Sequence, residues 1–164
     1  MKNLFKTYFK SPMGLIEICG TSDSITSLFF LDEEQHSEAK SNSYLENCTQ
    51  QVGEYFEGKR KQFDLNLLPK GTIFQKRVWD ELIKIPFGIT KSYLEITKIL
   101  GDEKAIRAVA NANGQNKISI IIPCHRVIGS DGSLTGYGGG LWRKKWLLDH
   151  ERKLSGGEKQ MDLF

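Results

Sequence analysis

The hydrophobic pattern of the chain changes at residues 68–71, and this change constrains the fold more than any other feature. Before it, short apolar segments alternate with polar turn signals, which is typical of antiparallel strands. After it, apolar residues recur every three or four positions, which is typical of amphipathic helices. We therefore expect an α+β protein with an N-terminal domain over residues 1–70, a C-terminal domain over 71–154 and a flexible tail over 155–164.

Three apolar segments of the N-terminal domain, residues 4–9, 15–19 and 25–31, are separated by turn signals and predict an antiparallel meander. Residues 44–57 follow with the spacing of a helix, and an alternation over 63–67 predicts one more short strand. The N-terminal domain is therefore expected to be a small antiparallel β-sheet with one helix.

Two capping-box patterns predict where helices begin in the C-terminal domain, at Thr72 and at Ser92. The first helix would end before Pro86, the second would run to about Leu100, and a third would cover 103–113 after a short glycine-containing turn. This order predicts a helix-turn-helix. The many alanines of its second helix would allow a partner to approach closely, although tight helix packing explains the same composition.

The charges are unevenly distributed between the two domains. Residues 1–70 carry a net charge of −2, whereas residues 71–154 carry +6. A basic domain favours a nucleic-acid partner, although an ordinary solvated surface also explains the positive charge.

The three cysteines show no CxxC spacing, so we expect no disulfide framework and a cytoplasmic location. No segment approaches the ~20 apolar residues of a membrane helix, and we expect no membrane partner.

The most informative segment is residues 118–128, where an apolar run ends and Cys124, His125 and Arg126 follow. A thiol between apolar packing and two potential cations is a setting for a lowered pKa and a reactive thiolate. His125 could relay the proton if Glu151 orients it. A buried structural cysteine and a hydrogen-bonded structural histidine are the alternatives. No second Cys/His pair has the spacing of a zinc site, so we expect no metal.

Residues 122–127, with the sequence IPCHRV, resemble the PCHR signature of the O6-alkylguanine-DNA alkyltransferases. Further family segments occur in order at 92–93 (SY), 107–109 (RAV), 116 (N), 136–139 (GYGG) and 146–151 (WLLDHE). The resemblance covers about residues 72–152 and implies a winged helix-turn-helix-like C-terminal domain. The N-terminal half resembles the family's ribonuclease H-like domain only in size and in its strand-helix pattern.

The resemblance implies direct-reversal DNA repair, in which O6-methylguanine is flipped out of the duplex and its alkyl group passes irreversibly to Cys124. His125 would receive the thiol proton through a water and Glu151 would hold the imidazole. Asn116 would brace the turn that presents the cysteine, and Tyr93 would hydrogen-bond the guanine and help to protonate it. Because a thioether has no easy route to hydrolysis, each molecule would react once, without a cofactor.

The same resemblance implies residues that contact DNA and the flipped base. Arg107 would enter the duplex from the minor groove and fill the place of the extruded nucleotide. The further DNA contacts would be Ala105, Ala108, Ser92 and Arg126. The base pocket would be formed by Tyr93, Val127, Tyr137 and Gly138. Many members of the family carry a polar residue where this chain has Gly138, so one hydrogen bond to the base oxygen would be missing.

The chain ends with QMDLF at residues 160–164, which resembles the pentapeptide by which bacterial proteins bind the DNA sliding clamp. Leu163 and Phe164 would anchor in an apolar pocket, and Gln160 would hydrogen-bond beside it. A frayed terminus is the alternative. We otherwise expect a monomer.

Two functions of other classes remain open at this point. A non-catalytic protein could bind alkylated guanine and recruit other factors, although the presence of Cys124 argues against the alkyltransferase-like branch that lacks the acceptor. A cysteine hydrolase could use Cys124, His125 and Glu151, but it would need an oxyanion hole, for which the sequence gives no support.

Overall fold

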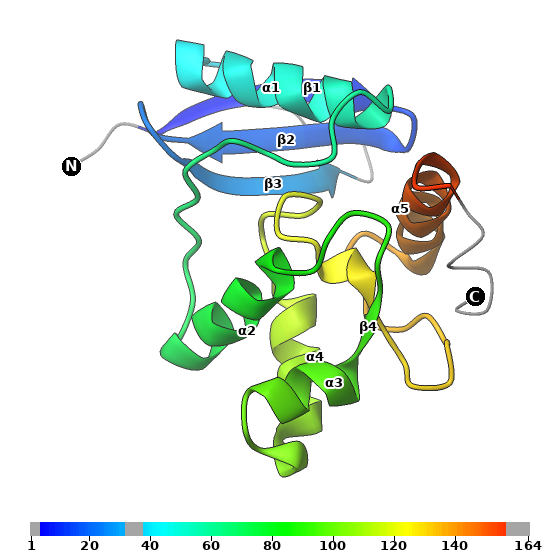
Figure 1. Cartoon of the computed structure of the whole chain (residues 1–164). Helices are drawn as coiled ribbons and strands as arrows, with labels where there is room; N and C mark the ends of the chain where they lie inside the picture. Colours follow the sequence, from blue (N-terminus) through cyan, green and yellow to red (C-terminus); the bar gives the residue numbers. More distant parts are fainter. Residues whose placement is uncertain (1–3, 32–37, 157–164) are drawn as a thin grey trace. The chain divides into compact units, whose positions relative to one another are not determined.

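The computed structural model describes residues 4–31 and 38–156, and the chain divides into two compact units (Figure 1). The first unit spans Met1–Lys70 and the second spans Gly71–Phe164. In the described part of the chain, no helix combines the length and the apolar character that a membrane span requires.

The first unit contains a three-stranded antiparallel sheet and one helix. The strands are β1 (Phe5–Ser11), β2 (Gly14–Gly20) and β3 (Ile25–Leu31), in the spatial order β1-β2-β3. Helix α1 (Ser43–Phe56) packs against β1 and β2 and lies along one face of the sheet (Figure 1). The predicted antiparallel meander with a helix is therefore confirmed.

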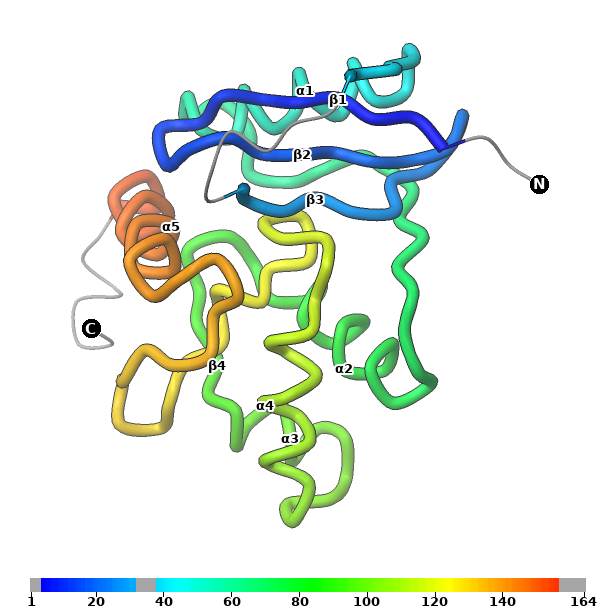
Figure 2. Tube along the Cα trace, turned by 180° about the vertical axis from the view of Figure 1, so that it is seen from behind, coloured from blue at the N-terminus to red at the C-terminus, as the bar shows by residue number. Residues whose placement is uncertain are grey.

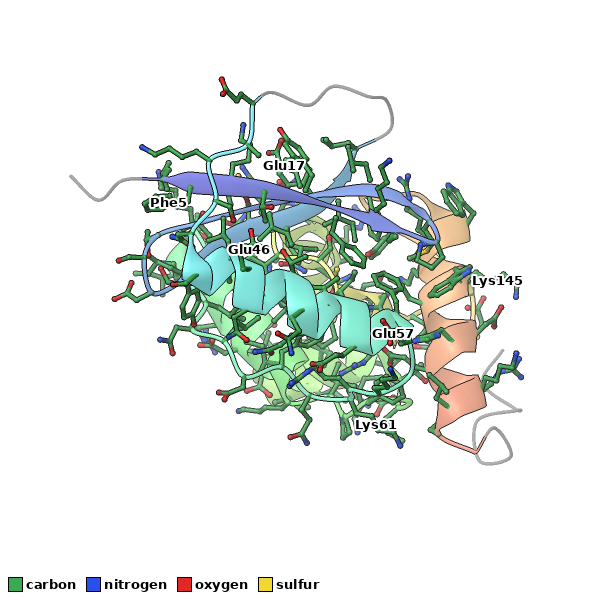
Figure 3. All side chains as sticks on the ribbon, turned by 90° about the horizontal axis from the view of Figure 1, so that it is seen from above. Phe5, Glu17, Glu46, Glu57, Lys61 and Lys145 are labelled. Atoms are coloured by element: carbon green, nitrogen blue, oxygen red, sulfur yellow. The ribbon has the colours of Figure 1, made fainter. Side chains whose placement is uncertain are left out.

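Apolar residues at alternate positions of β2 and on one side of α1 form the core of this unit. Ile16 and Ile18 on β2, and Leu45 and Val52 on α1, are fully buried. The exposed Glu46 lies on the outer side of α1 (Figure 3). The period of two in the strand and the helical spacing in α1 thus place both apolar faces against each other.

The strand predicted over residues 63–67 is wrong, because the segment makes only an isolated bridge to β3. Side chains take up its backbone amides instead. The amide of Asp64 donates to Oε1 of Gln51 at 2.9 Å, and the amide of Asn66 donates to the Tyr44 hydroxyl at 2.7 Å. Because side-chain oxygens accept hydrogen bonds from these two amides, the amides need no partner strand.

The second unit is mostly helical, as predicted. Its elements in chain order are α2 (Ile73–Ile83), β4 (Lys91–Ser92), α3 (Tyr93–Ile99), η1 (Glu103–Ala105), α4 (Ile106–Gly114), η2 (Cys124–Arg126), β5 (Val127–Ile128) and α5 (Leu141–Leu154), where η denotes a 3₁₀ turn. Both predicted capping boxes form, at Thr72 and at Ser92. The short strands β4 and β5 pair in parallel, which the sequence did not predict.

The helices α3 and α4 pack together through a short turn, in a helix-turn-helix arrangement (Figure 2). The turn begins at Gly101, whose φ of 89° lies in the left-handed region that glycine adopts freely. Asp102 then caps η1 by accepting a hydrogen bond from the Lys104 amide at 3.0 Å. The outer face of α4 exposes Arg107 and Ala108.

Trp79 joins α2 to the end of α4. Its side chain is 2% exposed, and its indole Nε1 donates to the carbonyl oxygen of Ala112 at 2.8 Å. The same carbonyl also accepts from the amide of Gln115 at 3.2 Å, so the indole supplies a second hydrogen bond at the C-terminal end of α4.

We expect Trp79→Phe to lower the free energy of unfolding by about 1–3 kcal/mol, because the Ala112 carbonyl loses the shorter of its two hydrogen bonds and the smaller ring leaves a cavity in the core. Urea unfolding followed by circular dichroism measures this change. Trp142→Phe is the matched control, because Trp142 is 57% exposed, and its effect should stay within about 0.5 kcal/mol. Equal losses in the two variants would contradict this account of Trp79.

Candidate active site

Cys124 begins η2, directly after a tight buried turn over residues 118–122. Within this turn, Ile120 has a φ of 71°, which a residue with a branched Cβ rarely adopts. The amide of Ile122 donates to the carbonyl of Ile118 at 3.0 Å and closes the turn. Such backbone strain is of order 1–3 kcal/mol and persists only where its surroundings fix it, often at functional sites.

Asn116 braces this turn and contacts the thiol. Its Nδ2 donates to the carbonyl of Ile122 at 2.8 Å and lies 3.2 Å from Sγ of Cys124. Its Oδ1 accepts from the amide of Ile118 at 3.0 Å. One amide side chain therefore holds both the backbone of the turn and the sulfur at its end.

Glu151 on α5 is the centre of a buried cluster of hydrogen bonds. Its Oε2 lies 2.7 Å from Nε2 of His125, and its two oxygens accept from Nε and Nη2 of Arg126 at 2.8 and 3.0 Å. The amide of Gly88 donates to Oε1 at 3.1 Å. Arg126 also donates through Nη1 to the carbonyl of Ile85 at 2.6 Å. The cluster therefore ties α5 to the cysteine turn.

The charge on Glu151 fixes the protonation of His125. Burial alone would raise the pKa of Glu151, but His125 and Arg126 hold it well below its ordinary value. An ionised carboxylate only accepts hydrogen bonds, so Nε2 of His125 carries the proton and Nδ1 has a free lone pair. Burial lowers the pKa of His125, and its buried Nδ1 has no hydrogen-bond partner. The ring is therefore a neutral proton acceptor.

The expectation of a lowered thiol pKa is wrong. Burial raises the pKa of Cys124, which is 5% exposed, and this outweighs the opposing effects of the Asn116 hydrogen bond and the Lys144 charge. The two cations that the sequence suggested are not available to the sulfur, because Arg126 is paired with a carboxylate and His125 is neutral. Cys124 therefore rests as a thiol.

Lys144 is a buried cation beside the reaction centre that the sequence analysis missed. Its Nζ donates to the carbonyl of Thr135 at 2.8 Å and to the hydroxyl of Tyr93 at 3.3 Å, and the residue is fully buried. Burial lowers its pKa to about 8. The spacing in the sequence could have indicated this position. Lys144 precedes Glu151 by two helical turns and lies on the same buried face of α5 as Leu148.

Two family models match the chain and together span most of it. The model described as "6-O-methylguanine DNA methyltransferase, DNA binding domain" matches residues 73–153. The model described as "6-O-methylguanine DNA methyltransferase, ribonuclease-like domain" matches residues 4–69. The chain belongs to the 6-O-methylguanine DNA methyltransferase family.

Individual members of this family resemble the chain over nearly its whole length. A methylated-DNA–protein-cysteine methyltransferase of Mycolicibacterium paratuberculosis is 46% identical over 88% of this chain and 90% of its own. The constitutive enzyme of Bacillus subtilis is 42% identical over 90% of this chain and 95% of its own. The O6-methylguanine methyltransferase structure of Mycobacterium tuberculosis superposes with a TM-score of 0.84 at 39% identity and covers 97% of this chain and 99% of its own.

A further Mycobacterium tuberculosis structure, of OGT in complex with DNA, has a TM-score of 0.81 at 42% identity. It covers 90% of this chain and 93% of its own chain.

Four of the five residues predicted to contact DNA lie at least partly on the surface of the second unit. Arg107 and Ala108 are exposed on α4, and Ala105 at the end of η1 and Ser92 at the start of α3 are half-buried. Arg126 differs, because it is 6% exposed and its guanidinium is bound within the buried cluster. The prediction that Arg126 contacts DNA is therefore wrong, and its observed role is to hold the carboxylate.

The residues predicted to form the base pocket include two buried tyrosines. Tyr93 donates to the carbonyl of Thr135 at 2.9 Å, whereas the buried hydroxyl of Tyr137 has no partner. Val127 is buried on β5, and Gly138 is exposed. A Cβ at Gly138 would meet only the backbone carbonyl of Gly114, at 3.8 Å, so a residue with a side chain would fit at this position.

Among the described residues, no group of three or more His, Cys, Asp or Glu could hold a metal ion.

We expect Lys144→Met to shift the pH profile of Cys124 alkylation to higher pH, because the variant lacks the cation that favours the thiolate. Lys144 is charged below its pKa of about 8, so the difference from the wild type should be largest there and should vanish at higher pH. Iodoacetamide labelling with peptide mapping at Cys124 measures the profile. Lys145→Met, which removes an exposed lysine on the same helix, should leave it unchanged. A profile that Lys144→Met does not shift would contradict this role.

Proposed function

We propose that this protein repairs DNA by moving the O6-alkyl group of guanine, chiefly a methyl group, onto Cys124, once per molecule. The observation that carries the proposal is a buried thiol 3.2 Å from the Asn116 amide, beside a histidine whose free nitrogen is oriented by a buried carboxylate. Membership of the 6-O-methylguanine DNA methyltransferase family supplies the substrate class. The hydrolase alternative has no comparable support.

In this reaction the thiol proton of Cys124 passes through a bridging water to Nδ1 of His125 as the sulfur attacks the alkyl carbon. The new bond is S–C, and the bond that breaks is C–O6 of guanine, whose electron pair remains on the purine. Guanine leaves poorly unless a donor meets this charge, and the Tyr93 hydroxyl is the donor assigned to that role. Lys144, whose Nζ lies 3.3 Å from that hydroxyl, is placed to restore the proton.

The product explains why one molecule reacts once. Cys124 becomes a thioether, which is not hydrolysed as an acyl-enzyme is, and so the thiol is not regenerated. The acceptor is part of the chain, so the reaction needs no cofactor. The protein is an enzyme by its chemistry and a stoichiometric reagent by its use.

Access to the alkyl group requires that the base leave the duplex. We propose that α4 enters the minor groove, where its small side chains permit close approach, and that Arg107 takes the place of the flipped nucleotide. The exposure of Arg107 and Ala108 on this helix supports the proposal.

Cys124→Ser should bind duplex DNA containing O6-methylguanine with nearly the wild-type affinity and should transfer no methyl group, because a hydroxyl is a poor nucleophile at neutral pH. Gel-shift titration measures affinity, and loss of methyl label from the DNA measures transfer. Cys48→Ser, at a buried cysteine of the first unit, is the control and should still transfer. Transfer by Cys124→Ser would overturn the assignment of the acceptor.

Arg107→Ala should slow transfer from a duplex much more than transfer from free O6-methylguanine base, because only the duplex needs the extruded nucleotide replaced. Single-turnover rates on the two substrates measure the difference. If both rates fall by the same factor, Arg107 does not act on the duplex.

Residues 160–164 lie outside the described residues, and we propose that Gln160, Leu163 and Phe164 bind a bacterial sliding clamp. The support is the sequence pattern, with two apolar anchors behind a glutamine. Deletion of these five residues should abolish clamp capture in a pull-down and leave methyl transfer intact. Capture that survives the deletion would refute the proposal. The monomeric state and the cytoplasmic location remain predictions.

A further inference from the structure

Residues 85–88, between α2 and β4, present two backbone groups of opposite polarity to the buried cluster around Glu151. The carbonyl of Ile85 accepts from Nη1 of Arg126 at 2.6 Å, and the amide of Gly88 donates to Oε1 of Glu151 at 3.1 Å. A carbonyl therefore meets the cation, and an amide meets the carboxylate. Hydrogen bonds to ionised groups are roughly twice as strong as those between neutral groups.

The direction of the Gly88 amide follows from the turn that contains it. The amide of Ile89 donates to the carbonyl of Pro86 at 3.1 Å and closes a four-residue turn. Gly88 is the third residue of this turn, and its φ of 80° is the value that a type II turn requires at this position. Residues with a side chain favour the type I turn, in which the peptide group before the third residue is turned over. The carbonyl of Phe87 would then face the carboxylate in place of the amide.

Close packing is a second reason for glycine at this position. Gly88 is buried, and a Cβ on it would lie 2.6 Å from Oγ and 2.7 Å from Cβ of Ser155, the residue that follows α5. A larger residue would therefore push the C-terminal end of α5 away from the turn. Glu151 lies one helical turn before Ser155, so its carboxylate would move with this end of the helix.

We infer that Gly88 is a positioning residue for the proton transfer from Cys124, and that it acts through Glu151 on His125. The inference rests on the proposed function. Gly88 bonds to Oε1 of the carboxylate, and Nε2 of His125 lies 2.7 Å from the other oxygen, Oε2. Together with Arg126, the Gly88 amide fixes the rotation of the carboxylate and keeps Oε2 directed at the ring.

The position of this carboxylate sets how readily His125 accepts a proton. The charged groups that act on the buried ring are Glu151 and Lys144 of α5 and Arg126 of η2, and of these only the carboxylate raises the pKa of His125. A carboxylate that is turned or moved away leaves the ring a weaker base. Cys124 then gives up its proton only at higher pH.

The test measures the pH profile of Cys124 alkylation by iodoacetamide in Gly88→Ala, with peptide mapping at Cys124. We expect the profile to lie at higher pH than that of the wild type. Single-turnover methyl transfer from O6-methylguanine duplex at neutral pH should be slower by a factor on the order of ten or more. A purely structural role would lower the folded fraction and leave the profile in place, so the profile is the readout.

Gly156→Ala is the matched control. Gly156 also has a positive φ, of 96°, directly after Ser155, and a Cβ on it would meet none of the described atoms within 4 Å. Its profile should equal that of the wild type. If Gly88→Ala does not fold, the double variant with Ser155→Gly takes its place, because the atoms that the new methyl group would meet are then absent. Ser155→Gly alone is the control for the double variant and should keep the wild-type profile.

An unchanged profile in a folded Gly88 variant, or the same shift in Gly156→Ala, would overturn the inference. The labelling reaction contains no DNA, so its result does not depend on the repair activity. Failure of the wild type to demethylate O6-methylguanine would instead overturn the proposed function.

Discussion

The buried carboxylate of Glu151 is the group on which the rest of the second unit depends. It is 1% exposed and accepts hydrogen bonds from His125, Arg126 and the amide of Gly88. Removing one partner of a buried ion pair commonly costs about 3–5 kcal/mol, because the other charge is left uncompensated. The same carboxylate selects the histidine tautomer that can accept a proton. Stability and chemistry therefore rest on one cluster.

The site keeps its nucleophile neutral until the substrate arrives. Burial raises the pKa of Cys124, and the neutral ring of the next residue, His125, has an open lone pair on Nδ1. A buried thiol of this kind is protected from adventitious oxidation, which follows thiolate character and exposure. Such protection suits a reagent whose cysteine reacts once. It also separates this site from a turnover hydrolase, which must regenerate its nucleophile.

Local signals predicted much of the fold, and contacts between distant residues account for most of what was missed. The capping boxes at Thr72 and Ser92 depend on residues three positions apart, so the sequence alone contains them. The segment 63–67 was mispredicted because distant side chains take its amides. Arg126 was placed toward DNA because its carboxylate partner is 25 residues away, and no local pattern indicates that pairing.

The proposed repair moves one alkyl group irreversibly to one sulfur. The most direct measurement is the intact mass of the protein over time with excess O6-methylguanine duplex, followed by peptide mapping. We expect the mass of a single added methyl group, located on Cys124, with no further increase and no more than one lesion repaired per molecule. Repair of several lesions per molecule, or an unmodified Cys124 in protein that has repaired DNA, would contradict it.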